Sequence, residues 1–317
     1  MPQAASAVRP TWDGLPAEVR HAIEECAGSS VRQAVSQGGG FTSGFASRLE
    51  LEDGRRLFVK AATSEQHVFA RPSYERESAV VRGLPAAVPA PRVLWTRDLG
   101  AWFVAAFEDV EGRHPLRPWD PSELSAVVDL CVLLADELTP VPEALPAPHP
   151  LTEWDDDFSF WRRRSSGDQA ALAVPLAEGW APLVGDLAAA EASWTVRCAG
   201  TTGLHFDLRD DNLLVRPDGS VVVCDWNHLT LGAAWLDLAA LLVSVHGDGL
   251  DADTLWAASP LTDGVDEDAL VAFLAAVAGF FVDVAAQEEV PGSPYLREHQ
   301  AWWRDASLSW LDSRLQG

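Results

Sequence analysis

Two carboxylates and an amide in the C-terminal half of this chain have the spacing of a metal and hydroxyl site. The stretch from His205 to Asn212 reads HFDLRDDN, and Asp225 follows thirteen residues after Asn212. Asp225 ends the apolar run 221–224, so its carboxylate would lie at the rim of the core. Asp and Asn oxygens are ligands that Mg²⁺ prefers, so Asn212 and Asp225 could hold a metal while Asp207 orients a hydroxyl. An acidic surface loop between two apolar strands would give the same pattern.

A lysine and a glutamate in the N-terminal third form a second candidate group. Lys60 lies among apolar residues in a predicted strand, 56–61, where burying a charge is costly without a partner. Glu75 and Glu77 lie in a predicted helix, 74–84, and point about 200° apart. The apolar positions put Glu77 on the buried side, which favours it as the partner. The alternative is a Lys60 on the solvent face of an edge strand.

The segments around these residues predict a small sheet that carries one helix. Residues 1–11 lack periodicity and are expected to form a loose tail, and the glycine-rich segment 38–44 reads GGGFTSG. Backbone N–H groups in such a turn can hold phosphate, although a plain strand connection fits equally well. A helix is predicted over 13–27, and strands over 45–52, 56–61, 92–96 and 101–110, with an Asp-Gly hairpin turn after the first strand.

The pattern becomes helical beyond Pro121. Helices are predicted over 122–138, 154–164, 180–197 and most of the chain after 234, with a short hairpin formed by 213–215 and 221–224. A proline-rich connector, 139–150, follows the first of them. No internal repeat is visible, so the sequence predicts a small α+β lobe followed by a larger, mostly helical lobe.

This order of features resembles the protein-kinase-like superfamily, and within it the aminoglycoside phosphotransferase family of small-molecule kinases. The resemblance rests on H-x-D-x-x-x-x-N followed by an Asp at a strand end, and it covers about residues 35 to 285. It implies an α+β, two-lobed fold. The N-terminal nucleotide-binding lobe, with an antiparallel sheet and one helix, would span 1–110. The catalytic and substrate-binding lobe would span 111–317.

The resemblance also implies roles for the residues of the C-terminal motif. Asp207 would accept the proton of the substrate hydroxyl, and Asn212 and Asp225 would bind Mg²⁺. His205 would support the catalytic loop, and Asp237 in the downstream helix would brace it.

Further roles follow for the nucleotide side and for Arg209. Lys60 would contact the nucleotide phosphates and pair with Glu77, and the glycine-rich loop would use the hydroxyls of Thr42 and Ser43. The backbone of segment 107–110, with Glu108 and Val110, would bind adenine. Arg209 would contact the transferred phosphate; a salt bridge to Asp210 or Asp211 is the alternative. Trp226 after Asp225 and the missing H-R-D and A-P-E signatures argue against a protein kinase.

Composition limits the partners. The chain has 23 basic and 47 acidic residues, a formal charge of −24, which repels nucleic acids and anionic membranes and permits a cationic partner. Acidic residues over 153–157, beside Trp154 and Trp161, would suit a polyamine sugar or simply a helix N-terminus. Most of the 14 tryptophans are also explained by helix packing.

Location is predicted from what the sequence lacks. The longest apolar run, 269–282, is short for a bilayer and suits a buried helix. The four cysteines lack metal or disulfide spacing and no signal-peptide pattern is visible, so a cytoplasmic protein is expected.

The sequence therefore predicts an ATP- or GTP- and Mg²⁺-dependent phosphotransferase acting on a small-molecule hydroxyl. The resemblance favours an aminoglycoside or related antibiotic as acceptor. A metabolic kinase for a sugar, nucleoside or amino alcohol shares every catalytic residue, and a catalytically silent nucleotide-binding protein is the third alternative. The chain would act as a monomer or homodimer.

Overall fold

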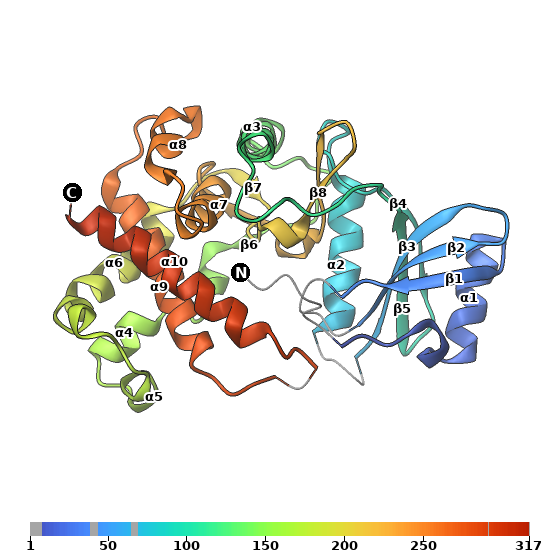
Figure 1. The fold of residues 1–317 in the computed structure, drawn as a ribbon, viewed down its shortest axis with the longest axis horizontal. Coiled ribbons are helices and arrows are strands. Elements are labelled where there is room, and N and C mark those ends of the chain that lie inside the picture. Colours follow the sequence, from blue (N-terminus) through green and yellow to red (C-terminus); the bar gives the residue numbers. More distant parts are fainter. Residues whose placement is uncertain (1–7, 39–43, 65–68, 291, 317) are drawn as a thin grey trace.

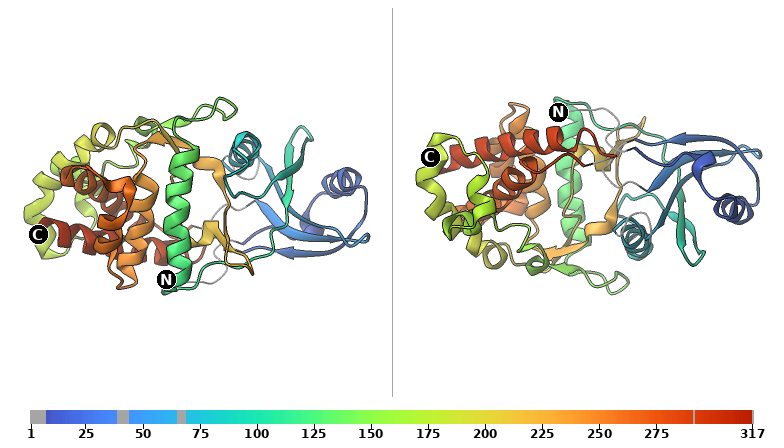
Figure 2. Two further views of the ribbon diagram at one scale, coloured as in Figure 1. Left: turned by 90° about the horizontal axis from the view of Figure 1, so that it is seen from above. Right: turned by 90° about the horizontal axis from the view of Figure 1, so that it is seen from below.

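A computed structural model describes residues 8–38, 44–64, 69–290 and 292–316. The predicted loop residues Thr42 and Ser43 lie outside these ranges. Figure 1 shows a sheet at one end of the molecule and a larger group of helices at the other. The two parts meet around helix α2 (Ala70–Gly83), which lies between the sheet and the helical lobe in all three views (Figures 1 and 2).

The sheet has five antiparallel strands in the order β1-β2-β3-β5-β4. They are β1 (Val31–Ser36), β2 (Phe45–Leu51), β3 (Arg56–Thr63), β4 (Val93–Asp98) and β5 (Trp102–Glu108). Lys60 on β3 pairs with Ala46 on β2 and with Ala105 on β5. The lysine is therefore on the central strand, which excludes the edge-strand alternative.

The alternation of side chains along β3 gives each face of the sheet its own helix. Val59 and Ala61 pack with α1 (Ala17–Ala27) in one apolar core. Lys60 and its neighbour Ala62 point to the other face, because successive side chains of a strand alternate. There Ala62 packs against Ala70 and Tyr74 of α2, so the sheet itself turns Lys60 toward the helix that carries Glu77.

The helical lobe forms the second and larger core. Its helices are α3 (Pro121–Glu137), α4 (Phe160–Ser165), α5 (Gln169–Ala173), α6 (Val184–Arg197), α7 (Leu236–Gly247), α8 (Ala252–Ala258), α9 (Glu267–Ala285) and α10 (Leu296–Gln316). Short strands lie among them: β6 (His149–Pro150), β7 (Thr202–Leu204), β8 (Leu213–Val215), β9 (Val221–Val223) and β10 (Thr230–Gly232). Single 3₁₀ turns complete the chain: η1 (Trp12–Gly14), η2 (Leu151–Trp154), η3 (Glu178–Leu183), η4 (Asp210–Asn212), η5 (Trp226–His228) and η6 (Pro260–Thr262).

Helix α9 is the central helix of this lobe. Within the described part of the chain it is the one helix whose length and composition would allow it to cross a membrane. It packs against α6 and α10, and eleven of its nineteen residues are buried inside the protein. The sequence-based prediction of a buried helix over 269–282 is confirmed.

The structure differs from the sequence-based elements most clearly in three places, and α5 and the short strands β6, β7 and β10 were also not predicted. Strand β1 was not predicted, because this edge strand is largely polar and exposed and lacks an apolar alternation. The segment 154–164 does not form one helix. It contains the end of η2, a turn and then α4, and the Asp155 carboxylate in the turn binds the guanidinium of Arg162 and the indole of Trp194. The predicted helix 180–197 begins as η3, which contains Pro182, and becomes α-helical at Val184.

Candidate active site

Lys60 lies at the centre of a group of charges between the lobes, in which Lys60 and Glu77 are buried and Asp225 is partly exposed. Its Nζ contacts both carboxylate oxygens of Glu77, at 2.9 and 2.7 Å, and Oδ1 of Asp225 at 2.5 Å. Glu75 instead pairs with Arg71 on the same helix. The predicted Lys60–Glu77 pair is thus present, and it extends to a residue from the other lobe.

Burial and charge oppose each other within this group. Burial disfavours the charged form of Lys60, but Asp225 and Glu77 outweigh this effect and hold the pKa of Lys60 above its usual value. Burial raises the pKa of Glu77. Burial also opposes ionisation of Asp225, yet the nearby Lys60 ammonium lowers the pKa of Asp225 to about 2. Asp225 therefore carries a full negative charge at neutral pH.

Asp207 follows a residue with an unusual backbone conformation. Phe206 has a φ of 62°, and Asp225 has a φ of 67°; no other non-glycine residue in the described ranges has a positive φ. Asp237, in the first turn of α7, accepts hydrogen bonds from the backbone N–H groups of His205 at 2.8 Å and Phe206 at 2.9 Å. Such a conformation persists only where its surroundings fix it. The brace expected of Asp237 is present.

His205 connects the loop of Asp207 to the segment after β9 that carries Asp225. Its ring is fully buried, and its Nδ1 accepts a hydrogen bond from the backbone N–H of Asp207 at 3.3 Å. Its Nε2 lies 2.8 Å from the carbonyl oxygen of Cys224. A ring with its proton on Nε2 satisfies both contacts. The histidine thereby fixes the two carboxylates relative to each other.

Asn212 and Arg209 both contact the Asp207 carboxylate. Asn212 Nδ2 donates to Asp207 Oδ2 at 3.0 Å and to the Asp207 carbonyl oxygen at 2.8 Å. Arg209 lies 3.3 Å from Asp207 Oδ2 and also pairs with Asp211 at 3.1 Å. The salt bridge considered for Arg209 therefore exists on the Asp211 side, alongside the contact to Asp207. The guanidinium is held within reach of any group that approaches Asp207.

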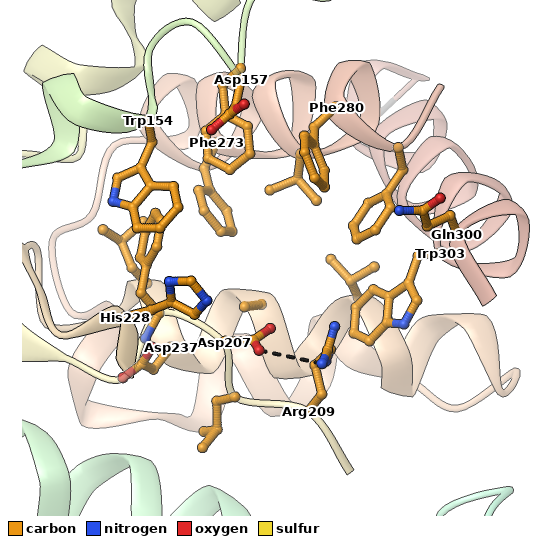
Figure 3. Close-up of a pocket in the computed structure, with 18 of the residues that line it drawn as sticks. Trp154, Asp157, Asp207, Arg209, His228, Asp237, Phe273, Phe280, Gln300 and Trp303 are labelled. Atoms are coloured by element: carbon orange, nitrogen blue, oxygen red, sulfur yellow. Dashed lines mark hydrogen bonds and ion pairs between the residues drawn. The ribbon is translucent and has the colours of Figure 1, made fainter. Parts of the chain in front are cut away.

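Two cavities meet at these residues. One, of about 130 Å³, lies between the lobes and is lined by Lys60, Asn212 and Asp225. The other, of about 490 Å³, lies inside the helical lobe and is lined by Asp207, Arg209 and again Asp225. Figure 3 shows Asp207 and Arg209 together on one side of this second cavity. The arrangement can hold a phosphate donor and an acceptor on the two sides of the same carboxylates.

The segment predicted to bind adenine lines the smaller cavity. Glu108 and Val110 both contribute to its wall. The backbone N–H of Glu108 donates to the Arg92 carbonyl oxygen at 2.8 Å, and the Val110 carbonyl oxygen accepts from Arg48 at 3.3 Å. The Glu108 carbonyl and the Val110 N–H are the backbone groups that these two bonds leave for a base.

The amino-acid sequence identifies the family of this protein. Residues 40–274, more than half of the chain, match the model of the phosphotransferase enzyme family. The chain belongs to that family. It is therefore an enzyme, a small-molecule kinase with a hydroxyl group as acceptor, and a nucleotide is its phosphoryl donor. Among curated protein sequences, none matches this phosphotransferase.

Solved structures of low sequence identity share the fold of this phosphotransferase. An apo thermostable mutant of aminoglycoside phosphotransferase APH(4)-Ia is 17% identical, with a TM-score of 0.62 over 93% of this chain and 98% of its own. A ternary complex of an APH(4)-Ia mutant with ADP and hygromycin B is 16% identical, with a TM-score of 0.60 over the same shares. Choline kinase LicA from Streptococcus pneumoniae is also 16% identical, with a TM-score of 0.58 over 94% and 100%. The predicted α+β, kinase-like fold is confirmed.

Two arginines near the site escaped the sequence analysis. Arg9, assigned to a loose tail, lines the smaller cavity and donates to the Gly44 carbonyl oxygen at 3.1 Å and to the Tyr74 hydroxyl at 3.3 Å. Arg117 is buried and pairs with Asp210 at 2.8 Å and with Asp248 at 2.7 Å. Nothing in the local sequence distinguishes either residue. The burial of Asp210 within the motif, which the structure reveals, is what requires a cation such as Arg117 nearby.

The acidic run at 153–157 is dispersed in the structure. Glu153 contacts His149, Asp155 binds Arg162 and the indole of Trp194, and neither carboxylate lines the larger cavity. Asp157 lines the larger cavity together with Trp154. Trp161 is fully buried in the core of the helical lobe, as helix packing would explain.

Proposed function

We propose that this phosphotransferase transfers the γ-phosphoryl group of ATP or GTP to a hydroxyl group of a small molecule, with Asp207 as the proton acceptor. One observation supports this above all: Asp225 lines both cavities, and Asp207 and Asn212 flank it on either side. A nucleotide in the inter-lobe cavity and an acceptor in the larger one would meet where these three residues converge. Positioning of this kind supplies most of the catalysis of phosphoryl transfer.

Asn212 and Asp225 would hold Mg²⁺. The Nδ2 of Asn212 is bonded to Asp207, which leaves its Oδ1 as the atom available to a cation. The carboxylate of Asp225 is ionised and about one-third exposed. One charged and one neutral oxygen ligand suit Mg²⁺, which keeps several waters and phosphate oxygens in its shell. Bound there, the ion would neutralise charge on the β- and γ-phosphates.

The remaining residues would bind and orient the nucleotide, the transferred phosphoryl group and the acceptor hydroxyl. Lys60, held by Glu77, would contact the phosphates, and Arg209 would stabilise the charge of the transferred group. The Asp207 carboxylate, oriented by Asn212, would accept the hydroxyl proton as the new O–P bond forms and the bond from the γ-phosphorus to the leaving oxygen breaks. The glycine-rich loop with Thr42 and Ser43 would cover the phosphates, and the backbone of Glu108 and Val110 would bind the base.

A coupled assay of nucleoside diphosphate release tests this function. Mg²⁺ with ATP or GTP is supplied, and acceptors are added as pools of antibiotics, sugars, nucleosides and amino alcohols, with Asp207→Asn as the blank. Release stimulated by a pool in the wild type and absent from the blank supports the proposal. Nucleotide binding without release stimulated by any pool would contradict the proposed transfer to these classes of acceptor.

A further inference from the structure

The walls of the 490 Å³ cavity are largely aromatic. Seven rings contribute to them: Trp154, Phe158, Phe206, Phe273, Phe280, Phe281 and Trp303. The rings contact one another, with centroids 5.3 Å apart for Trp154 and Phe206, 5.5 Å for Phe158 and Phe280, and 5.6 Å for the stacked Phe281 and Trp303. Trp154, Phe280 and Trp303 surround the open space in Figure 3. Their mutual packing fixes the shape of the cavity before any acceptor enters.

The carboxylates that line this cavity are mostly committed elsewhere. Asp237 accepts two backbone hydrogen bonds, Asp225 is paired with Lys60, and Asp207 contacts Arg209 and Asn212. Asp157 lies at the exposed edge, and burial, together with the neighbouring Asp156, raises the pKa of its carboxyl group. Within the described lining, Asp157 is the carboxylate left to receive a cationic acceptor.

The two histidines of the lining add no charge at neutral pH. Burial lowers the pKa of His228, and it lowers the pKa of His299 to about 3. Neutral imidazoles and the amide of Gln300 offer hydrogen bonds at fixed points of an otherwise apolar wall. This is the composition of a site for a ring-containing molecule with a few polar groups.

A polycationic acceptor fits these walls poorly. Each ammonium group that leaves water needs a carboxylate or several acceptors, because an unpaired buried charge is very unfavourable. An aminoglycoside carries several such groups, and this cavity offers one edge carboxylate. A cavity of this volume, by contrast, matches a drug-sized molecule with an apolar body. Aromatic walls gain from burying such a body and from stacking on its rings.

Resting on the proposed function, we propose that the acceptor is a hydroxylated molecule with a mainly apolar, ring-containing body and at most one positive charge. Its hydroxyl group lies at Asp207 and Arg209, and its body lies among Phe206, Phe280 and Trp303. A single amine, where the acceptor has one, lies at the outer edge beside Asp157. The net charge of −24 then serves the general surface of the protein and not acceptor binding.

Calorimetric binding to the full chain, in the presence of MgADP and physiological salt, tests the acceptor class. The ligands are chloramphenicol (neutral and aromatic), erythromycin (one amine), choline (small and cationic), and kanamycin and hygromycin B (polycationic). We expect at least one of the first two compounds to bind tenfold or more tightly than either polycation. Tighter binding of a polycation, or no binding of either apolar compound, overturns the proposal.

A charge-introducing variant sharpens this test without disturbing the fold. Gln300 lines the cavity, and its Oε1 accepts a hydrogen bond from Arg297 at 2.7 Å. Gln300→Glu turns that bond into an ion pair with Arg297 and so lowers the charge of the cavity wall by one unit. It should raise the affinity for kanamycin several-fold and lower the affinity for the neutral compound. An unchanged preference would show that charge in this cavity does not select the acceptor.

Removal of the edge carboxylate provides the second variant. Asp157→Asn should weaken binding of the single-amine compound several-fold, because the carboxylate proposed to contact the amine is lost. Asp156→Asn removes the same charge from a neighbouring exposed residue that does not line the cavity, and should leave that binding unchanged. Equal effects of the two variants would indicate a general surface-charge effect and would contradict the placement of the amine.

Phosphate transfer to the same compounds separates failure of the acceptor class from failure of the function. If a polycation is phosphorylated faster than every apolar compound, the phosphotransferase function stands and the acceptor class is wrong. If the apolar compounds bind beside MgADP but none accepts phosphate from MgATP, the ligand class stands and the proposed function is wrong.

Discussion

The two cavities that share Asp225 differ in the side chains that line them. The inter-lobe cavity is lined by charged side chains, among them Lys60, Arg9 and Asp211. The larger cavity carries many aromatic and aliphatic side chains, and its charged residues other than Asp157 include Asp207, Arg209 and Asp225 near the active-site residues. Phosphate chemistry is the same for every acceptor and requires fixed charges. The body of the acceptor differs from one enzyme to another, and an apolar body is bound best by aromatic side chains of the protein. Variants on the two sides should therefore affect different kinetic constants.

Asp207→Asn should have the largest effect. It removes the proposed proton acceptor at the junction of the cavities, so kcat should fall by about 10²–10⁴-fold. Binding of MgADP should persist, since Asp207 lines the acceptor cavity and not the nucleotide cavity. Steady-state kinetics and nucleotide calorimetry measure the two effects. A variant with kcat near that of the wild type would remove Asp207 from the chemistry.

Lys60→Met should impair the function of the inter-lobe cavity and also lower the stability of the protein. It leaves the buried Glu77 without its cation, and breaking a buried pair typically costs about 3 kcal/mol of unfolding free energy. The KM for ATP should rise or kcat should fall, while binding of the acceptor stays close to that of the wild type. Denaturant unfolding and kinetics with each substrate varied measure these effects. Arg32→Met, at an exposed position on β1, is the matched control. Equal losses in the two variants would mean that Lys60 has no special role.

Phe280→Ala should weaken binding of the acceptor and leave binding of the nucleotide unchanged. Losing an aromatic contact worth about 1.5 kcal/mol should raise the acceptor KM roughly tenfold. The KM for ATP should not change, because Phe280 is absent from the lining of the inter-lobe cavity. Leu172→Ala, at an exposed apolar position on α5, is the control. A parallel rise in both KM values would show that the two cavities are not independent.

Arg9→Ala should have the smallest effect. Arg9 lines the nucleotide cavity from the N-terminal segment and is only partly buried, so the KM for ATP should rise roughly threefold, an effect of about 0.7 kcal/mol. Arg20→Ala, whose partner Asp13 is exposed, serves as control. An unaltered KM for ATP would assign Arg9 to tethering the segment and not to nucleotide binding.

The charged side of the site could be predicted because its residues are close in sequence or follow simple periodicity. Asp207, Asn212 and Asp225 lie within nineteen residues, and the helical phase selected Glu77 over Glu75. The direct contact of Lys60 with Asp225 could not be predicted, since 165 residues separate them. The same limit applies to Arg117, whose partners Asp210 and Asp248 come from distant segments.

The sequence alone indicated most of the longer helices and strands, the α+β two-lobed class and the residues capable of phosphate chemistry. These depend on local periodicity and on the chemical types of side chains, which a linear chain already contains. The tertiary structure decided which rings face the acceptor, which acidic residues are consumed by internal pairs, and that Asp225 belongs to both cavities. Trp154 and Trp161 look alike in the sequence, but one lines the cavity and the other is buried in the core. Such differences arise when distant segments pack together, because burial and pairing are properties of the folded surface and not of any segment.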